Sequence, residues 1–241
     1  SVMARGYSMM TLAFLLLLIV GARLQEHESV EGWILFAIVA ALGLWTIPVM
    51  LFPLGTAALW LAGSSAARRR WTEVRNLGLA LVLAGAVTAL LYLPVVMHEG
   101  VHAITSNQFV APSTWQQFIG EMVVNGVDIM RYWTFGMPGL LALTLGACAI
   151  IGVRWHDDVS RRSFDVPFAA LVWCSLFLML NPRAPAPRMW QWLIPIAAGA
   201  AGAGLVWLLE RSPRMDAFQR RIEHIAVGFA LVTGVLLLLP Q

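Results

Sequence analysis

The sequence has 241 residues, of which 59% are hydrophobic and only 12% are charged. A soluble domain carries about 25% charged residues, so this composition excludes an ordinary soluble protein, and it also excludes a disordered or fibrous chain. The formal net charge is +3 and every basic residue is an arginine, so we consider where the arginines lie along the membrane normal rather than a nucleic-acid partner.

Apolar segments separated by charge clusters predict an all-α fold, a polytopic transmembrane helix bundle with about eight spans. In chain order they are 7–23, 32–46, 48–62, 77–96, 135–153, 166–181, 190–209 and 225–239. The second and third are short and meet at Thr46-Ile47-Pro48, where proline interrupts a helix. They form either two short spans or one bent re-entrant pair. Cys148 and Cys174 lie inside apolar segments and are predicted to be buried.

The arginines favour two separate short spans. If the chain starts outside the cytoplasm and crosses eight times, twelve of the sixteen arginines lie on the cytoplasmic side, as the positive-inside rule expects. The four outer ones are Arg5, Arg131, Arg183 and Arg188. Merging the short segments would reverse every later loop and remove this asymmetry. We therefore expect both ends of the sequence to be extracytoplasmic.

One long extracytoplasmic loop is predicted at 96–133. Its acids and histidines are Glu99, Glu121, Asp128, His98 and His102. Apolar side chains recur at helical spacing in 114–124, which predicts an amphipathic helix on the membrane surface. Long ordered loops often carry function, so the three acids are candidate site residues; a solvated cap over the bundle is the alternative.

The string His98-Glu99-Gly100-Val101-His102 resembles a zinc-protease motif. Histidines four residues apart on a helix can hold one zinc ion, and the intervening glutamate can act as general base. This favours an intramembrane zinc metalloprotease as an alternative function. However, Pro94 and Gly100 disturb helix formation, and no motif supplies a third ligand. We therefore predict no tightly bound zinc at His98 and His102.

Arginines near two outer segment ends are candidate anion-binding groups. Arg183 and Arg188 lie in 181–188, a turn that three prolines stiffen. Guanidinium groups bind phosphate through paired hydrogen bonds. Arg5 lies just before the first apolar segment and Tyr7 at its start, and together they predict an interfacial anchor. Ordinary snorkelling to lipid headgroups is the alternative role for these arginines.

The string Ala4-Arg5-Gly6-Tyr7 before a leucine-rich helix resembles the A-R-x-Y segment of bacterial polytopic glycosyltransferases of the GT-C class, which include protein mannosyltransferases and the lipid A aminoarabinose transferase. Further similar features follow in the same order over nearly the whole chain. They are the helix break at 45–48, the arginines at 68–70, the helix end at 91–94, the loop at 107–112, the Pro187-Arg188 turn and Pro195. The specificity of the resemblance lies in this order and spacing.

The resemblance implies transfer of a sugar from a polyprenyl-phosphate-linked donor to a lipid or glycan acceptor, on the extracytoplasmic face of the bacterial inner membrane. It implies that Arg188, Arg183, Arg5 and Tyr7 bind the donor phosphate, with membrane lipids as further partners and no nucleic acid. The family's catalytic acid precedes the segment seen here, and Met9 and Met10 occupy the positions of a second acid found in some relatives.

We therefore expect 1–241 to be a single transmembrane domain that forms the C-terminal part of a longer enzyme. No cofactor is predicted from the residues present, and a divalent metal in the full-length enzyme is left open. A non-catalytic membrane scaffold or transporter is the remaining alternative. Transporters are commonly built from internal repeats, and the sequence shows none that is convincing.

Overall fold

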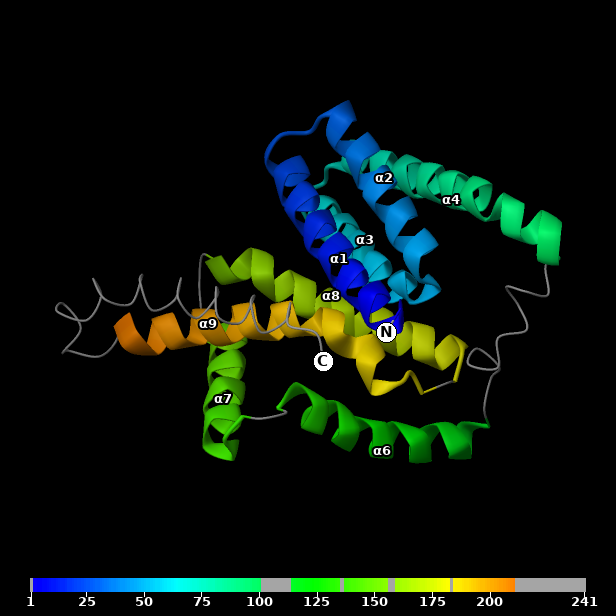
Figure 1. Cartoon of the computed structure of the whole chain (residues 1–241). Helices are drawn as coiled ribbons and strands as arrows, with labels where there is room; N and C mark the ends of the chain where they lie inside the picture. The colour runs from blue at the N-terminus through cyan, green and yellow to red at the C-terminus, as the bar shows by residue number, and fades with distance from the viewer. Residues whose placement is uncertain (1, 101–113, 135–136, 156–158, 183, 211–241) are drawn as a thin grey trace.

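The computed structural model describes residues 2–100, 114–134, 137–155, 159–182 and 184–210 (Figure 1). All elements in these ranges are helices, and no strand occurs among them. They are α1 (Val2–Glu26), α2 (Val30–Thr46), η1 (Pro48–Met50), α3 (Leu51–Ala67), α4 (Trp71–Glu99), α6 (Trp115–Trp133), α7 (Gly139–Trp155), α8 (Val159–Leu180), η2 (Pro187–Leu193) and α9 (Ile194–Glu210). The predicted all-α fold is confirmed for this part of the chain, and the predicted segment 225–239 lies outside it.

Helix length and apolarity make the chain an integral membrane protein. The described residues contain four segments long and apolar enough to cross a membrane: Gly6–Glu26, Pro48–Ala67, Trp71–His98 and Pro187–Leu208. Three shorter apolar helices accompany them: Val30–Thr46, Gly139–Val153 and Val166–Leu180. A helix rises 1.5 Å per residue, so about 20 residues are needed to cross the hydrocarbon core.

Helix ends in the first part of the chain follow local sequence. The Ser29 hydroxyl accepts a hydrogen bond from the Gly32 backbone N–H at 3.1 Å and caps α2. The predicted break at Thr46-Ile47-Pro48 is confirmed, because α2 ends at Thr46, Ile47 is extended and Pro48 opens η1. Proline fits at the first position of a helix because its missing N–H would have no partner there.

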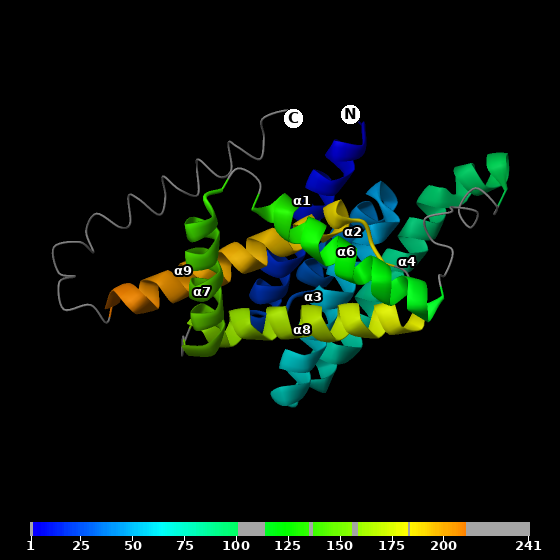
Figure 2. The same cartoon turned by 90° about the horizontal axis from the view of Figure 1, so that it is seen from below.

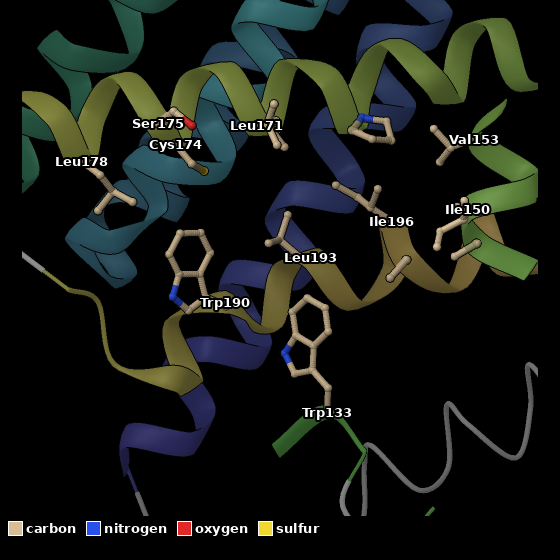
Figure 3. Close-up of a pocket in the computed structure, with 15 residues that line it drawn as sticks. Trp133, Ile150, Val153, Leu171, Cys174, Ser175, Leu178, Trp190, Leu193 and Ile196 are labelled. Atoms are coloured by element: carbon tan, nitrogen blue, oxygen red, sulfur yellow. The ribbon is translucent and has the colours of Figure 1, made fainter. Parts of the chain in front are cut away.

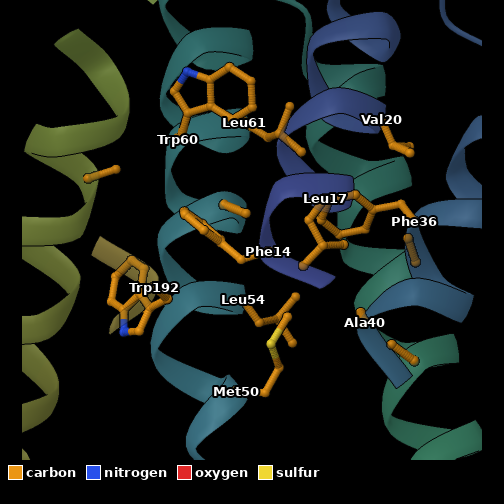
Figure 4. Packing of buried hydrophobic residues seen from close by; sticks show 14 of the residues in the cluster. Phe14, Leu17, Val20, Phe36, Ala40, Met50, Leu54, Trp60, Leu61 and Trp192 are labelled. Carbon is orange, nitrogen blue, oxygen red and sulfur yellow. The ribbon is translucent and has the colours of Figure 1, made fainter. Parts of the chain in front are cut away.

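Helices α1 to α4 share a core of large side chains. Figure 1 shows that α1 and α2 run antiparallel. Phe14 and Leu17 of α1, Phe36 of α2 and Met50 of η1 have no exposed surface and belong to one buried cluster, in which Phe36 reaches toward Leu17 and Phe14 extends toward Trp192 (Figure 4). Close-packed interiors of this kind tolerate little change in volume.

A cluster of polar side chains connects α1, α3 and α4 at the end of these helices that lies opposite the α2–α3 turn. Arg70 donates hydrogen bonds to the Glu73 carboxylate at 2.9 Å and to the Gln25 carbonyl at 3.2 Å. The Ser65 hydroxyl donates to the second carboxylate oxygen of Glu73 at 2.7 Å. Glu73 is buried, and these partners compensate its removal from water.

The later helices join this core through close backbone contacts. On α8, Trp173 packs directly on Gly55 of α3, and its indole N–H donates to the Leu51 carbonyl at 3.1 Å. Helices α7 and α9 cross where Gly152 and Gly204 allow their backbones to touch. Any Cβ at either glycine would overlap the partner backbone, so glycine is required at this crossing.

Candidate functional site

Four elements gather at one end of the molecule, which we call the η2 end: the start of α1, the α2–α3 turn, η2 and α6 (Figures 1 and 2). A Cβ built on Gly6 would lie 4.0 Å from the Ile47 side chain. The rings of Phe52 and Trp190 are 5.8 Å apart. Segments that are far apart in sequence, including several that were predicted to be extracytoplasmic, therefore meet here.

The 3₁₀ helix η2 directs its side chains to three different surroundings. Residues three apart share a face in a 3₁₀ helix, so Met189 and Trp192 form one face, which points into the core. Trp192 is fully buried and meets Phe14 edge to face at 5.0 Å. Trp190 and Leu193 form a second face and line a cavity. The third face carries Arg188 and Gln191 and is turned toward α6.

Helix α6 lies against η2 and is held there by polar contacts. The Asn125 amide donates to the Pro185 carbonyl at 3.4 Å, and the Gln191 amide lies 2.5 Å from the Tyr132 hydroxyl. Thr114 and Gln117 form a capping box that fixes the start of the helix. The amphipathic helix predicted from 114–124 is thus confirmed, and it extends to Trp133.

The apolar arc of α6 is only half covered. Phe118, Met122 and Ile129 are partly buried on the side of the bundle. The neighbouring side carries a row of exposed apolar residues: Trp115, Ile119, Val123, Val127 and Met130. An exposed apolar row on a helix beside membrane helices is typical of a helix that lies in the membrane interface.

The predicted donor-site residues differ in where the structure places them and in how exposed they are. Arg188 is exposed on η2 and forms no ion pair with any described residue. Tyr7 is only 8% exposed and belongs to the core of α1, so its ring does not extend into the solvent or the interface. Arg5 lies on α1, but its side chain is outside the described part, and Arg183 lies wholly outside it.

Of the three predicted acids, the structure describes the side chains of Glu121 and Asp128. Glu121 and Asp128 are exposed and lie seven residues apart on the polar side of α6. Asp128 faces Arg131 at 4.0 Å, an exposed contact that contributes little to stability. Glu99 is the last residue of α4, and its side chain lies outside the described part.

The expectation that Pro94 disturbs the helix before His98 is wrong. Helix α4 continues through Pro94 to Glu99 and ends at Gly100, which has a φ of 74°. A proline late in a long helix removes one backbone hydrogen bond without ending the helix. His98 is exposed in the last turn, whereas His102 lies outside the described residues.

The described part of α4 ends at Glu99 and includes only the first of the two histidines, so the paired arrangement on one helical face lies outside the described residues. Among the described residues there is also no group of three or more metal-ligating side chains. The absence of tightly bound zinc remains a prediction.

An apolar cavity of about 650 Å³ lies between α7, α8 and α9 (Figure 3). Its lining includes Leu171, Cys174, Leu178, Trp190, Ile196 and Ala200. Trp133 of α6 and Trp190 of η2 line it where those elements meet, and their indole N–H groups are buried without a partner among the described residues. The sequence did not predict this cavity, since it arises where three helices meet. Its size falls in the usual range of ligand pockets.

Comparisons of the chain with protein-family models, with curated proteins and with solved structures find no match.

Proposed function

We propose that this chain binds a polyprenyl-phosphate-linked sugar donor and belongs to a membrane glycosyltransferase that acts on the extracytoplasmic face. The observation that carries the proposal is the position of Arg188. It is exposed on a turn that two buried tryptophans hold, and it lies two residues from Trp190, which lines an apolar cavity. A guanidinium group can bind the phosphate of such a lipid, and a nearby apolar cavity can hold its hydrocarbon chain.

The physical properties of arginine suit this role. Guanidinium stays charged and offers paired donors to phosphate oxygens, whereas an ammonium group acts as a point charge. Trp192, fixed against Phe14, holds the backbone of η2 in place. A binding group on a rigid turn loses less conformational entropy when it binds its ligand. Arg183 and Arg5 remain proposed partners of the same phosphate.

We further propose eight spans with both ends outside and the 96–133 loop extracytoplasmic. The clustering of the α1 start, the α2–α3 turn, η2 and α6 at one end supports this topology, because each of them is predicted to lie outside. At the other end of these helices, five arginines lie in the last turn of α1, in the α3–α4 turn and at the start of α4. They are Arg23, Arg68, Arg69, Arg70 and Arg75. This asymmetry agrees with the positive-inside rule.

The proposal assigns no catalytic acid to the described residues. Glu121 and Asp128 are exposed near the η2 end and remain candidates for contact with the acceptor. The resemblance places the catalytic acid in an outer loop that would precede Arg5. An acidic pair in the coding sequence upstream of this segment would therefore support the glycosyltransferase assignment.

A donor titration tests the role of Arg188. The protein is reconstituted into lipid nanodiscs and titrated with a short polyprenyl phosphate. We expect Arg188→Ala to weaken binding by about 1.5–3 kcal/mol, the usual value of a hydrogen bond to a charged group. Arg188→Lys should restore part of the affinity, since it keeps the charge and loses the paired geometry.

Arg131→Ala is the matched control, because Arg131 is also exposed near the η2 end but lies on α6. It should bind like the wild type. Wild-type affinity in both Arg188 variants would remove Arg188 from the donor site and leave it as a membrane anchor.

A further inference from the structure

The cavity between α7, α8 and α9 opens at the surface of apolar helices. Ile150 of α7 and Leu171 of α8 both line it, yet they are 69% and 67% exposed. Helix α7 packs closely on α9 and makes much less contact with α8. The opening therefore lies between α7 and α8, two apolar helices. Lipid chains reach such an opening without crossing water.

The lining selects an apolar chain rather than a polar solute. Ser175 supplies the single hydroxyl group among the lining side chains, and no charged residue is present. The volume of about 650 Å³ is that of a site for one drug-sized apolar ligand. A single chain therefore fits better than the two chains of an ordinary phospholipid.

The polar end of such a ligand would lie beside η2. Trp190 is 9% exposed, and its buried indole N–H has no hydrogen-bond partner among the described residues. A buried donor without a partner is unfavourable, so an acceptor oxygen at this end of the cavity would stabilise a small rotation of the ring toward it. Arg188 lies two residues before Trp190, on the adjoining face of η2, and we assign the charge of the same headgroup to its long side chain.

We propose that the cavity between α7, α8 and α9 holds the prenyl chain of a single-chain lipid phosphate, which enters between Ile150 and Leu171 and places its head oxygens at Trp190. This inference rests on the proposed function and adds the position of the chain. An apolar wall discriminates weakly between hydrocarbon chains, so the selectivity for this lipid comes from its single chain and its phosphate.

Photocrosslinking tests the position of the chain. The nanodisc-reconstituted protein is irradiated with a short polyprenyl phosphate that carries a diazirine at the far end of its chain, and the labelled peptides are identified by mass spectrometry. We expect labels on α8 and α9 beside Leu171 and Ile196. Unlabelled polyprenyl phosphate should compete, and excess phosphatidylglycerol should not.

Two matched pairs of variants sharpen the test. Ala197 lines the cavity, whereas its neighbour Ala198 is exposed and does not. We expect Ala197→Phe to lower labelling and affinity by about tenfold, and Ala198→Phe to leave both unchanged. Trp190→Phe keeps the ring but removes the N–H, and should lower affinity severalfold. Trp192→Phe removes an equally unpartnered N–H that faces the core and should not.

The outcomes separate this inference from the proposed function. Binding that depends on Arg188 with labels confined to other helices would overturn the chain position and leave the donor site standing. Labels on α8 and α9 that phosphatidylglycerol removes would show an ordinary lipid site, and would also overturn the inference. Labelling that Ala197→Phe and polyprenyl phosphate both abolish, with wild-type affinity in Arg188→Ala, would support the cavity and contradict the proposed phosphate contact.

Discussion

Helices α1 to α4 and helices α7 to α9, the last three in the described part of the chain, are packed in different ways. In α1 to α4, large side chains such as Phe14, Leu17 and Phe36 interdigitate and leave no exposed surface (Figure 4). In α7 to α9, glycines at 152 and 204 bring two backbones together, and a cavity of about 650 Å³ remains beside them (Figure 3). The comparison shows that two helices can pack tightly against each other while the space between them and a third helix stays unfilled.

The membrane explains why such a space can persist. In water, an exposed apolar gap between helices would be closed by the hydrophobic effect. In a bilayer, lipid chains are as apolar as the helix side chains, so little free energy is gained by closing the gap. The small residues that allow α7 and α9 to touch also leave space toward α8 that their side chains do not fill. A binding site for a lipid chain can therefore be formed without a large cost in stability.

The largest effect is expected in the filled region. Phe14→Ala removes a fully buried ring that contacts Trp192 at 5.0 Å. We expect a loss of about 3–5 kcal/mol in the free energy of unfolding, because a cavity forms that the neighbours cannot fill. Leu171→Ala, at a cavity-lining position that is 67% exposed, should cost less than about 1 kcal/mol. Thermal unfolding of both variants in the same detergent measures the difference, and equal losses would show that the two regions are packed alike.

A smaller loss is expected at the α7–α9 crossing. Gly152→Ala places a methyl group against the Ala200 backbone, and backbone atoms cannot move aside as a flexible side chain can. We expect a cost of about 1–3 kcal/mol. Gly146→Ala on the same helix is the control, since no atom beyond its own helical turn lies within 4 Å of the added carbon; it should be neutral or stabilise the helix. Equal unfolding temperatures for the two variants would contradict a tight crossing.

The smallest effect is expected inside the cavity itself. Ala197→Phe adds a ring where the cavity has room, so the free energy of unfolding should change by less than about 1 kcal/mol. The same change at Ala40, which has no exposed surface in the α1–α4 core, should be strongly destabilising because the ring overfills that core. Comparable destabilisation at both positions would mean that the cavity is not available space.

Several features of the fold could be predicted from neighbours in sequence. The breaks at Ser29 and Pro48 follow from a capping hydroxyl and a missing N–H, and both are local properties. Cys148 and Cys174 are buried and unpaired, as predicted from their apolar segments. Hydropathy also identified membrane helices, because spanning length and composition are read directly along the chain.

The candidate site was predictable only in part. Arg188 on a proline-flanked turn was identifiable because guanidinium chemistry and proline stiffness are properties of the residues themselves. Its neighbours were not. Trp190 and Trp192 lie two residues apart at the start of the predicted segment 190–209, yet the 3₁₀ geometry of η2 sends one to the cavity and the other into the core. Tyr7, predicted as an interfacial anchor, is buried for a similar reason: α1 turns that face toward its neighbours.

The sequence by itself determined that this chain is a helical membrane protein, where several of its helices start and stop, and which face of 114–124 is apolar. Periodicity, capping and hydropathy act over a few neighbouring residues, so they can be read without the fold. Only the tertiary structure decided that η2 anchors α6, that Arg70 and Ser65 enclose Glu73, and that three helices leave a cavity. These depend on which helices meet and how close their backbones come, and that is fixed by packing between residues far apart in the chain.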